Sequence, residues 1–191
     1  MSFMNKKNII KIFMVFTLIA SSISLGLNAY GGNSEEKPIE MVSYANKLLN
    51  NKTDYNEDIS KIVNLLDSIP IPDGIKREDI TFQTSGVSNV IKFSYIINNY
   101  KKILDEDVIV VDQFRKNSII LLSLIDNVDI ITYSFIDKDS NHPGAIYTFP
   151  FTREYANNEM GYDITEKTES ADVFKDFLLK VENKCFEINQ K

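Results

Sequence analysis

The feature that most constrains the fold is an apolar stretch, residues 117–125, that continues through Asp126 and Asn127 into the apolar-polar alternation of Ile130–Ile136. The first stretch is apolar on nearly every side of a helix, so neighbouring elements must cover it on more than one side. Asp126 and Asn127 can end this helix, because asparagine accepts the left-handed conformation and both side chains offer acceptors to a turn. The sequence therefore predicts a helix at the centre of the core that leads directly into a strand.

Four short segments alternate apolar and polar side chains, which is typical of strands with one buried and one wet face. The predicted buried face carries Ile80, Phe82, Ile91, Phe93, Tyr95, Ile131, Tyr133, Phe135, Tyr147 and Phe149. The predicted wet face carries Thr81, Gln83, Lys92, Ser94, Thr132, Ser134 and Thr148. We interpret this second set as a hydroxyl-rich surface, which is either only solvated or a binding surface for a peptide, a glycan or a neighbouring protein.

Apolar residues at helical spacing predict further helices around these strands. Two of them precede the sheet, at residues 39–49 and 59–69, and two follow it. Thr152 is the expected cap of the first helix after the sheet, which Gly161 ends, and Ser170 is the expected cap of the last. The apolar stripe of that last helix consists of Val173, Phe174, Phe177, Leu178, Val181 and Cys185. The predicted fold is a single α+β domain with a four-stranded, mostly antiparallel sheet, helices covering one face, and the order ααββαββαα.

The beginning of the chain is typical of an exported protein. Residues 1–29 are basic and then apolar, as in a secretory signal peptide or, if uncleaved, an N-terminal membrane anchor. Residues 30–38 follow as a polar tether, and residues 39–191 form the predicted extracytoplasmic domain. We expect the protein at the extracytoplasmic face of the cell membrane or secreted, with membrane contact only through the N-terminal segment.

The charge balance bears on the class of partner. The chain has a net charge of −6, and residues 1–32 contain three lysines and no acidic residue, so their removal leaves −9. An acidic domain repels the phosphates of nucleic acids and of anionic lipids. We therefore expect no nucleic-acid partner.

Several motifs begin like metal or catalytic sites. Asp137, Asp139 and Asn141 have the alternate spacing of a calcium loop, but His142 replaces the glycine and Thr148 the glutamate that such a loop needs. His142 is the only histidine of the chain, and before a proline it is typical of an exposed turn. The sequence thus predicts no metal site and no serine-histidine-aspartate triad.

Other reactive residues also have structural interpretations. The acidic run 105–107 is typical of a solvated loop, and Cys185 on an apolar stripe is typical of a packed thiol. Arg153 and Glu154 stand just inside a helix, where the helix dipole favours Glu154 and Arg153 is expected to pair with a nearby acid. No catalytic residue and no cofactor are predicted.

The order of segments is similar to a known family. The segments that carry the resemblance are Lys52–Tyr55, Ser60–Leu66, Pro70–Ile75, Phe82–Thr84, Leu124–Asp129, Tyr147–Phe149 and Thr152–Glu154. They resemble the domain of unknown function 4825, over residues 47–181. The resemblance implies an exported or membrane-anchored protein of low-GC Gram-positive bacteria, in a family sometimes joined to membrane metallopeptidase sensors, and it implies no catalytic residues.

These observations favour a non-enzymatic binding or sensory module at the cell envelope. One alternative is a hydrolase whose site lies in a cleft between the sheet and the terminal helices, marked by acids with displaced pKa values. Another is a structural or inhibitory partner of an envelope protein. The sequence does not decide the ligand, the oligomeric state or the cleavage of the N-terminal segment.

Overall fold

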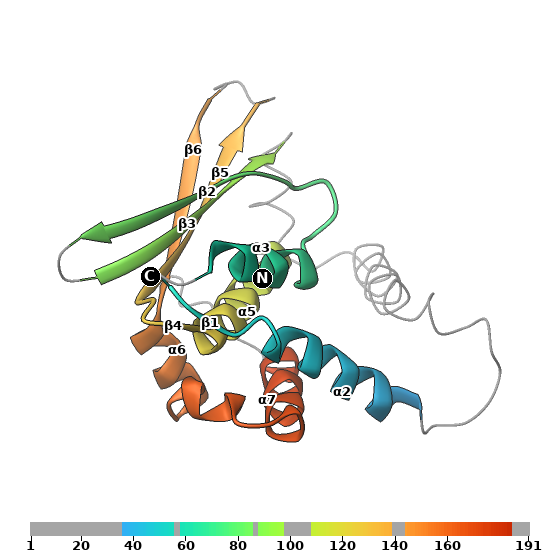
Figure 1. The fold of residues 1–191 in the computed structure, drawn as a ribbon. Coiled ribbons are helices and arrows are strands. Elements are labelled where there is room, and N and C mark those ends of the chain that lie inside the picture. The colour runs from blue at the N-terminus through green and yellow to red at the C-terminus, as the bar shows by residue number, and fades with distance from the viewer. Residues whose placement is uncertain (1–35, 56–57, 86–87, 98–107, 139–143, 185–191) are drawn as a thin grey trace, which may run out of the picture. The chain divides into compact units, whose positions relative to one another are not determined.

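The computed structural model describes residues 36–55, 58–85, 88–97, 108–138 and 144–184. The chain divides into two units, Met1–Pro38 and Ile39–Lys191, and nearly all described residues belong to the second. In order, the elements are α2 (Glu36–Leu49), β1 (Thr53–Asp54), α3 (Ile59–Ser68), β2 (Lys76–Ser85), β3 (Ser88–Ile97), α5 (Val108–Leu124), β4 (Ile125–Asp126), β5 (Ile130–Asp137), β6 (Ile146–Thr152), α6 (Arg153–Met160), the 3-10 helix η1 (Ile164–Thr168) and α7 (Ala171–Asn183) (Figure 1).

Some of the predictions fall outside the described residues. They concern the N-terminal segment and tether before Glu36, the acidic run 105–107, and the single residues Asp139, Asn141, His142 and Cys185.

One four-stranded sheet forms the β layer, with the strand order β2-β3-β5-β6. The outer pairs β2/β3 and β5/β6 are antiparallel, and the central pair β3/β5 is parallel. Parallel neighbours need a crossover connection, and α5 lies in it, on one side of the sheet in Figure 1. The predicted α+β class and the order of the long elements are confirmed; the short parallel pair β1/β4 was not predicted.

The apolar face of the sheet is buried as predicted. On the two central strands the six predicted residues are at most 2% exposed: Ile91, Phe93, Tyr95, Ile131, Tyr133 and Phe135. On the edge strands, Ile80, Phe82, Tyr147 and Phe149 are partly buried and pack against this core. Edge strands have a neighbour on one side only, which leaves part of each side chain uncovered.

Helix α5 is the centre of the core, and residues 117–125 are all buried. The helix begins at Val108, whereas the sequence predicted its start at Asn117. The added part carries Phe114, whose ring centroid lies 4.7 Å from that of Tyr133 and 5.0 Å from that of Phe135. Phe114 therefore closes the aromatic layer of the sheet, and the apolar residues after it face the other helices as well.

Polar side chains inside α5 are satisfied locally, which makes their burial tolerable. Ser118 Oγ donates to the carbonyl of Phe114 over 2.8 Å, and Ser123 Oγ donates to that of Ile120 over 2.7 Å. Asn117 reaches out of the helix, and its Nδ2 donates to the carbonyl of Pro70 over 2.9 Å. This last bond holds the turn after α3 against the central helix.

The predicted helix caps are confirmed. Thr152 Oγ1 accepts from the N–H of Tyr155, and Gly161 ends α6 with a left-handed φ of 78°. Ser170 caps α7. The prediction for Val173 was wrong, because its side chain is 39% exposed, whereas the rest of the described stripe is buried: Phe174, Phe177, Leu178 and Val181. Val173 precedes this stripe by one residue in the first turn, so it lies at the margin of the packed face.

Tyr95 gives a prediction about alkaline pH. Burial raises the pKa of Tyr95 to about 12, from the ordinary value of about 10. Because the folded state holds the phenol proton more tightly than the unfolded state, this contribution to stability is complete below about pH 10 and is lost as the pH rises through about 12. The free energy of unfolding, measured in urea at several pH values from about 10 upward, should therefore fall with rising pH in the wild type. In Tyr95→Phe this fall should be smaller by about 2 to 3 kcal/mol. An equal loss in the variant and the wild type would contradict the prediction.

Candidate functional site

The seven residues of the predicted wet face lie on one side of the sheet, opposite the face that α5 covers. We call this side, with all residues that alternate outward on the four strands, the open face. Strand register arranges the predicted residues in rows across neighbouring strands, namely Thr81-Lys92-Thr132 and Ser94-Ser134-Thr148, with Gln83 beyond the first row. The structure thus brings together side chains that lie up to 67 residues apart in the sequence, from Thr81 to Thr148.

The exposure of these residues differs from strand to strand. Thr81, Gln83 and Thr148 on the edge strands are exposed, and Lys92, Ser94 and Thr132 on the central strands are half-buried. Ser134 is only 1% exposed, so the prediction that it faces water was wrong. It is a small residue on a central strand, and its Oγ lies 3.2 Å from Thr148 Oγ1. Ser134 therefore holds Thr148 in place, and of these two hydroxyls only that of Thr148 is open to a ligand.

The open face also carries apolar rows that the sequence interpretation missed. Ile96, Ile136 and Ile146 form the row next to Ser94-Ser134-Thr148, and Ile146 is 60% exposed. A second apolar pair, Val90 and Ile130, lies beyond the hydroxyl rows at the other end. The signal was available, because Ile96, Ile136 and Ile146 each stand next to an inward-facing aromatic residue, namely Tyr95, Phe135 and Tyr147, and so occupy outward positions. The open face therefore has hydroxyl rows between two apolar margins.

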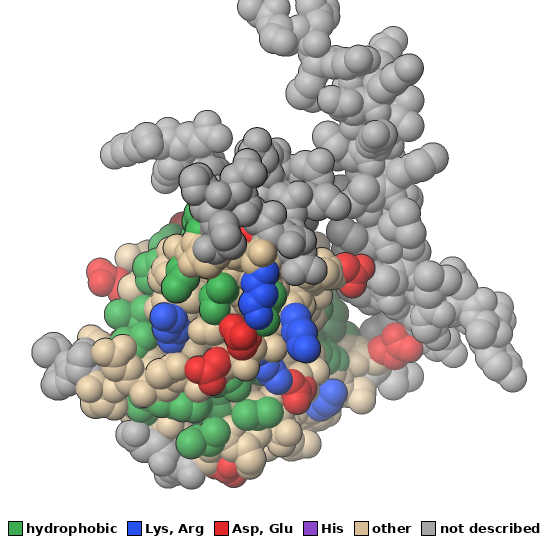
Figure 2. All heavy atoms as spheres, turned by 90° about the horizontal axis from the view of Figure 1, so that it is seen from above, with side chains coloured by type: hydrophobic (Ala, Val, Ile, Leu, Met, Phe, Trp, Pro, Cys, Tyr) green, Lys and Arg blue, Asp and Glu red, His purple; other side chains and the backbone are tan. Residues whose placement is uncertain are grey.

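On the face drawn in Figure 2, the described charged side chains form no large patch of one sign. Lysine, arginine, aspartate and glutamate side chains intermingle there, and hydrophobic side chains lie between them. A mixed surface of this kind does not attract a polyanion over long range.

A second group of polar residues lies where α5 passes into β5, and we call it the junction cluster. Its centre is Arg153, the first residue of α6, whose Nη1 donates to the carbonyl of Leu122 over 2.6 Å. Its Nη2 and Nε donate to the carbonyls of Ile125 and Val128, each over 2.9 Å. A helix leaves its last carbonyls without partners, so the first of these bonds satisfies a carbonyl in the last turn of α5, and the other two satisfy carbonyls of the segment that follows it.

The partner predicted for Arg153 was wrong, although its structural role is supported. Within the described ranges no carboxylate forms an ion pair with its guanidinium, and backbone carbonyls take its donors. Burial lowers the pKa of Arg153, and the charges of Asp126, Asp163 and Asp129 act against that shift. These acids therefore offset the cost of partial burial from a distance.

The remaining residues of the junction cluster bond to one another. The N–H of Asn89 donates to Asp129 Oδ2 over 2.8 Å, and the N–H of Asp129 donates to the Asn89 carbonyl over 2.9 Å. Asn89 Nδ2 donates to the carbonyl of Asn127, and Asn127 Nδ2 donates to the carboxylate of Asp54. Asn127 has the left-handed φ of 60° that its place in the sequence predicted. The cluster holds β1, β3 and the start of β5 together, and its polar groups serve that purpose.

One cavity of about 230 Å³ lies in the region of the predicted cleft between the sheet and the terminal helices. Its lining consists of Arg115, Pro150, Phe151, Thr152 and Tyr155, without a carboxylate. A second cavity of about 480 Å³ lies between the end of α6 and the last turns of α7.

Within the described ranges no three histidine, cysteine or acidic residues come close enough to share a metal ion. No helix in these ranges has the length and apolarity to span a membrane.

Together these features define an α+β domain with a buried helix packed on one face of a mixed sheet, and no helix among the described residues covers the other face. The chain belongs to the family described as a domain of unknown function (DUF4825), whose model matches residues 48–152. The predicted family is confirmed, but the match ends at Thr152, so α6, η1 and α7 lie beyond it. No curated protein and no solved structure matches the chain.

Arg153 gives a prediction about stability. Arg153→Lys keeps the positive charge but replaces three donors in a fixed fork by one ammonium, which cannot reach all three carbonyls. Because each buried carbonyl left without a donor costs about 1 to 3 kcal/mol, we expect the free energy of unfolding in urea to fall by about 2 to 4 kcal/mol.

The matched control is Arg77→Lys, since Arg77 pairs with the exposed Asp67. A surface ion pair contributes about 0 to 1 kcal/mol, so this variant should unfold nearly as the wild type does. Equal effects of the two substitutions would show that Arg153 contributes only its charge.

Proposed function

We propose that this chain is an exported, non-enzymatic binding module that holds a protein or peptide partner of the cell envelope on its open face. The observation that carries the proposal is the composition of that face, where hydroxyl rows lie between the isoleucine row Ile96-Ile136-Ile146 and the pair Val90 and Ile130. Isoleucines bury apolar area against a partner, and hydroxyls fix its orientation by hydrogen bonds. The basic and then apolar residues 1–29 support export.

A protein or peptide fits this surface better than a glycan does. Ile146 is 60% exposed on an edge strand, and its neighbours in the row, Ile96 and Ile136, are half-buried. A partly exposed apolar row next to hydrogen-bonding groups is typical of protein interaction sites. The partner is expected to lie across the face, because Pro150 on β6 has no N–H and weakens strand addition at that edge.

The junction cluster supports a binding role over a catalytic one. Arg153, Asn89 and Asp129 have the residue types that catalytic sites use, but each bonds to the backbone around it. A general acid, base or electrophile needs a free lone pair or proton directed at a substrate. These residues therefore stabilise the scaffold that presents the open face.

Site-specific photo-cross-linking in the cell that makes the chain tests the proposal. A photoreactive residue at Thr148, on the open face, should capture one defined envelope protein. The control position is Asp172 on α7, whose side chain is 84% exposed and lies away from the sheet. Capture of the same protein from both positions, or from neither, would contradict the proposal. Hydrolysis of peptides, esters or glycans by the purified full-length chain, abolished by one substitution in the chain, would favour the enzyme alternative.

Ile146→Thr should lower the cross-linking yield at Thr148 about fivefold, because about 1 kcal/mol of apolar contact with the partner is lost. Threonine keeps a branched β carbon, so the strand should remain intact. Ile59→Thr is the matched control, since Ile59 is 58% exposed but stands at the start of α3. An equal decrease in both variants would show that the isoleucine row is not the contact surface.

A further inference from the structure

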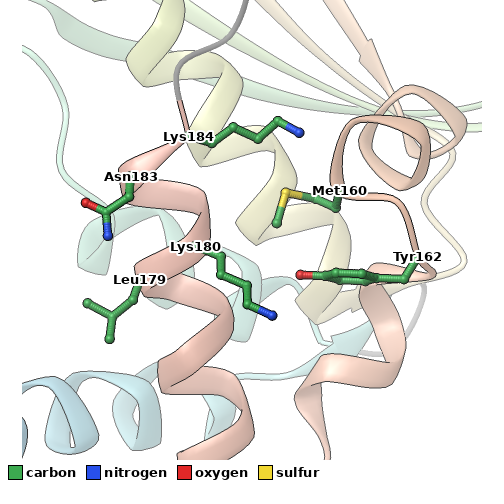
Figure 3. A pocket seen from close by; sticks show the side chains of 6 residues that line it. All are labelled: Met160, Tyr162, Leu179, Lys180, Asn183 and Lys184. Carbon is green, nitrogen blue, oxygen red and sulfur yellow. The ribbon is translucent and has the colours of Figure 1, made fainter.

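The cavity of about 480 Å³ at the end of the helical layer has the character of a ligand site, and none of its residues belongs to the open face. Met160 and Tyr162, at the end of α6 and in the segment after it, form one wall. The last turns of α7 and the residue that follows form the other, with Leu179, Lys180, Asn183 and Lys184. Figure 3 shows the Tyr162 hydroxyl pointing toward α7 and the Lys180 ammonium reaching back toward Tyr162.

Positive charge collects at this cavity although the chain as a whole is acidic. Lys180, in the lining of the cavity, has its Nζ 5.8 Å from the centroid of the Tyr162 ring, and Lys167, outside the lining, has its Nζ 4.7 Å from the same centroid. In the ranges that the structure describes, neither ammonium forms an ion pair with a carboxylate. Two cations on one ring repel each other, and a bound anion would remove that repulsion.

Tyr162 adds a hydrogen-bond donor. Its hydroxyl oxygen is enclosed and has no hydrogen-bond partner among the described residues. Burial raises the pKa of Tyr162, so the phenol keeps its proton at neutral pH and can donate it to an anion. An enclosed polar atom without a partner costs free energy, and a ligand oxygen would recover it.

The remaining lining sets the chemical class of the ligand. Met160 and Leu179 are apolar, and Lys184 is already engaged by Glu159, with Nζ 3.6 Å from Oε2. Two ammonium groups without carboxylate partners match the charge of a phosphate monoester, which is about −1.5 to −2 at neutral pH. We infer that this cavity binds a small phosphomonoester with an apolar body, in which Lys180 and Tyr162 contact the phosphate, Lys167 adds its charge from beside the Tyr162 ring, and Met160 and Leu179 contact the body.

Phenyl phosphate is the probe for this site, and isothermal titration calorimetry on the full-length chain measures its affinity. We expect saturable binding that is tighter than that of inorganic phosphate, which has no apolar body, and of benzoate, which has a single charge. No saturable binding of phenyl phosphate, or binding equal to that of benzoate, would overturn the inference.

Lys180→Gln should weaken phenyl phosphate binding about five- to tenfold, because the charge-assisted bond from the ammonium to the phosphate is lost. The matched control is Lys175→Gln, which removes the same charge from the same helix, where Lys175 pairs with Asp176 over 3.5 Å. Equal weakening in both variants would reveal only general attraction to a basic helix and would overturn the inference.

Tyr162→Phe provides a second variant that should fold, since the hydroxyl has no partner within the described chain. We expect its phenyl phosphate affinity to fall about threefold and its melting temperature to remain that of the wild type or to rise. An unchanged affinity would exclude the phenol from the site. None of these outcomes depends on a partner at the open face, so the two proposals stand or fall separately.

Discussion

The carbonyl groups at the end of α5 impose the constraint on which the rest of the structure depends. A helix leaves its last four carbonyls without intrahelical partners, and water usually satisfies them. Helix α5 ends at Leu124, which is fully buried, so water does not reach this end. Arg153 donates to the carbonyl of Leu122 in this last turn and to those of Ile125 and Val128 just beyond it, and so fixes the first residue of α6 against the end of α5. Because β6 runs directly into α6, the same bonds position the edge strand that carries Thr148 and Ile146.

The position of α5 also decides which face of the sheet is open. The helix lies in the crossover between β3 and β5, and Phe114 packs on Tyr133 and Phe135 from one side. The reciprocal bonds between Asn89 and Asp129 join the start of β3 to the start of β5. One face of the sheet therefore packs in the core, and the side chains that point outward from the other face do not contribute to that core. The isoleucines among them are not needed for packing against α5, which is why we assign them to a partner.

Much of this arrangement could be predicted because its causes are local. The alternation along β3 and β5 assigns the two faces, since successive side chains of a strand point in opposite directions. Asn127, Thr152 and Ser170 could each be assigned from the conformation or the capping bond that its own residue type favours. These features depend on neighbours within a few positions, and the sequence displays such neighbours directly.

The features that could not be predicted depend on contacts between distant parts of the chain. The carbonyls that Arg153 satisfies lie 25 to 31 residues away, so an acid was the natural expectation for its partner. The start of α5 at Val108 could not be predicted, because the short apolar run of residues 108–111 suits a strand as well as a helix. The site between the end of α6 and α7 was the hardest to predict. Tyr162, just after α6, lies near Lys180 of α7 only because the two helices pack on the same core. No spacing in the sequence indicates that meeting.

The two proposed surfaces differ in the force that would hold a ligand. The open face offers exposed apolar area and neutral hydroxyls, so binding there would draw chiefly on burial, which salt does not screen. The cavity beside Tyr162 offers Lys167 and Lys180, whose attraction for an anion weakens as the ionic strength rises and the Debye length falls below about 10 Å. The chain has 27 acidic against 21 basic residues, so these lysines, which form no ion pair within the described residues, lie in a field that otherwise repels anions. That field favours a small anion held in direct contact over a large polyanion, because only the small one escapes most of the repulsion.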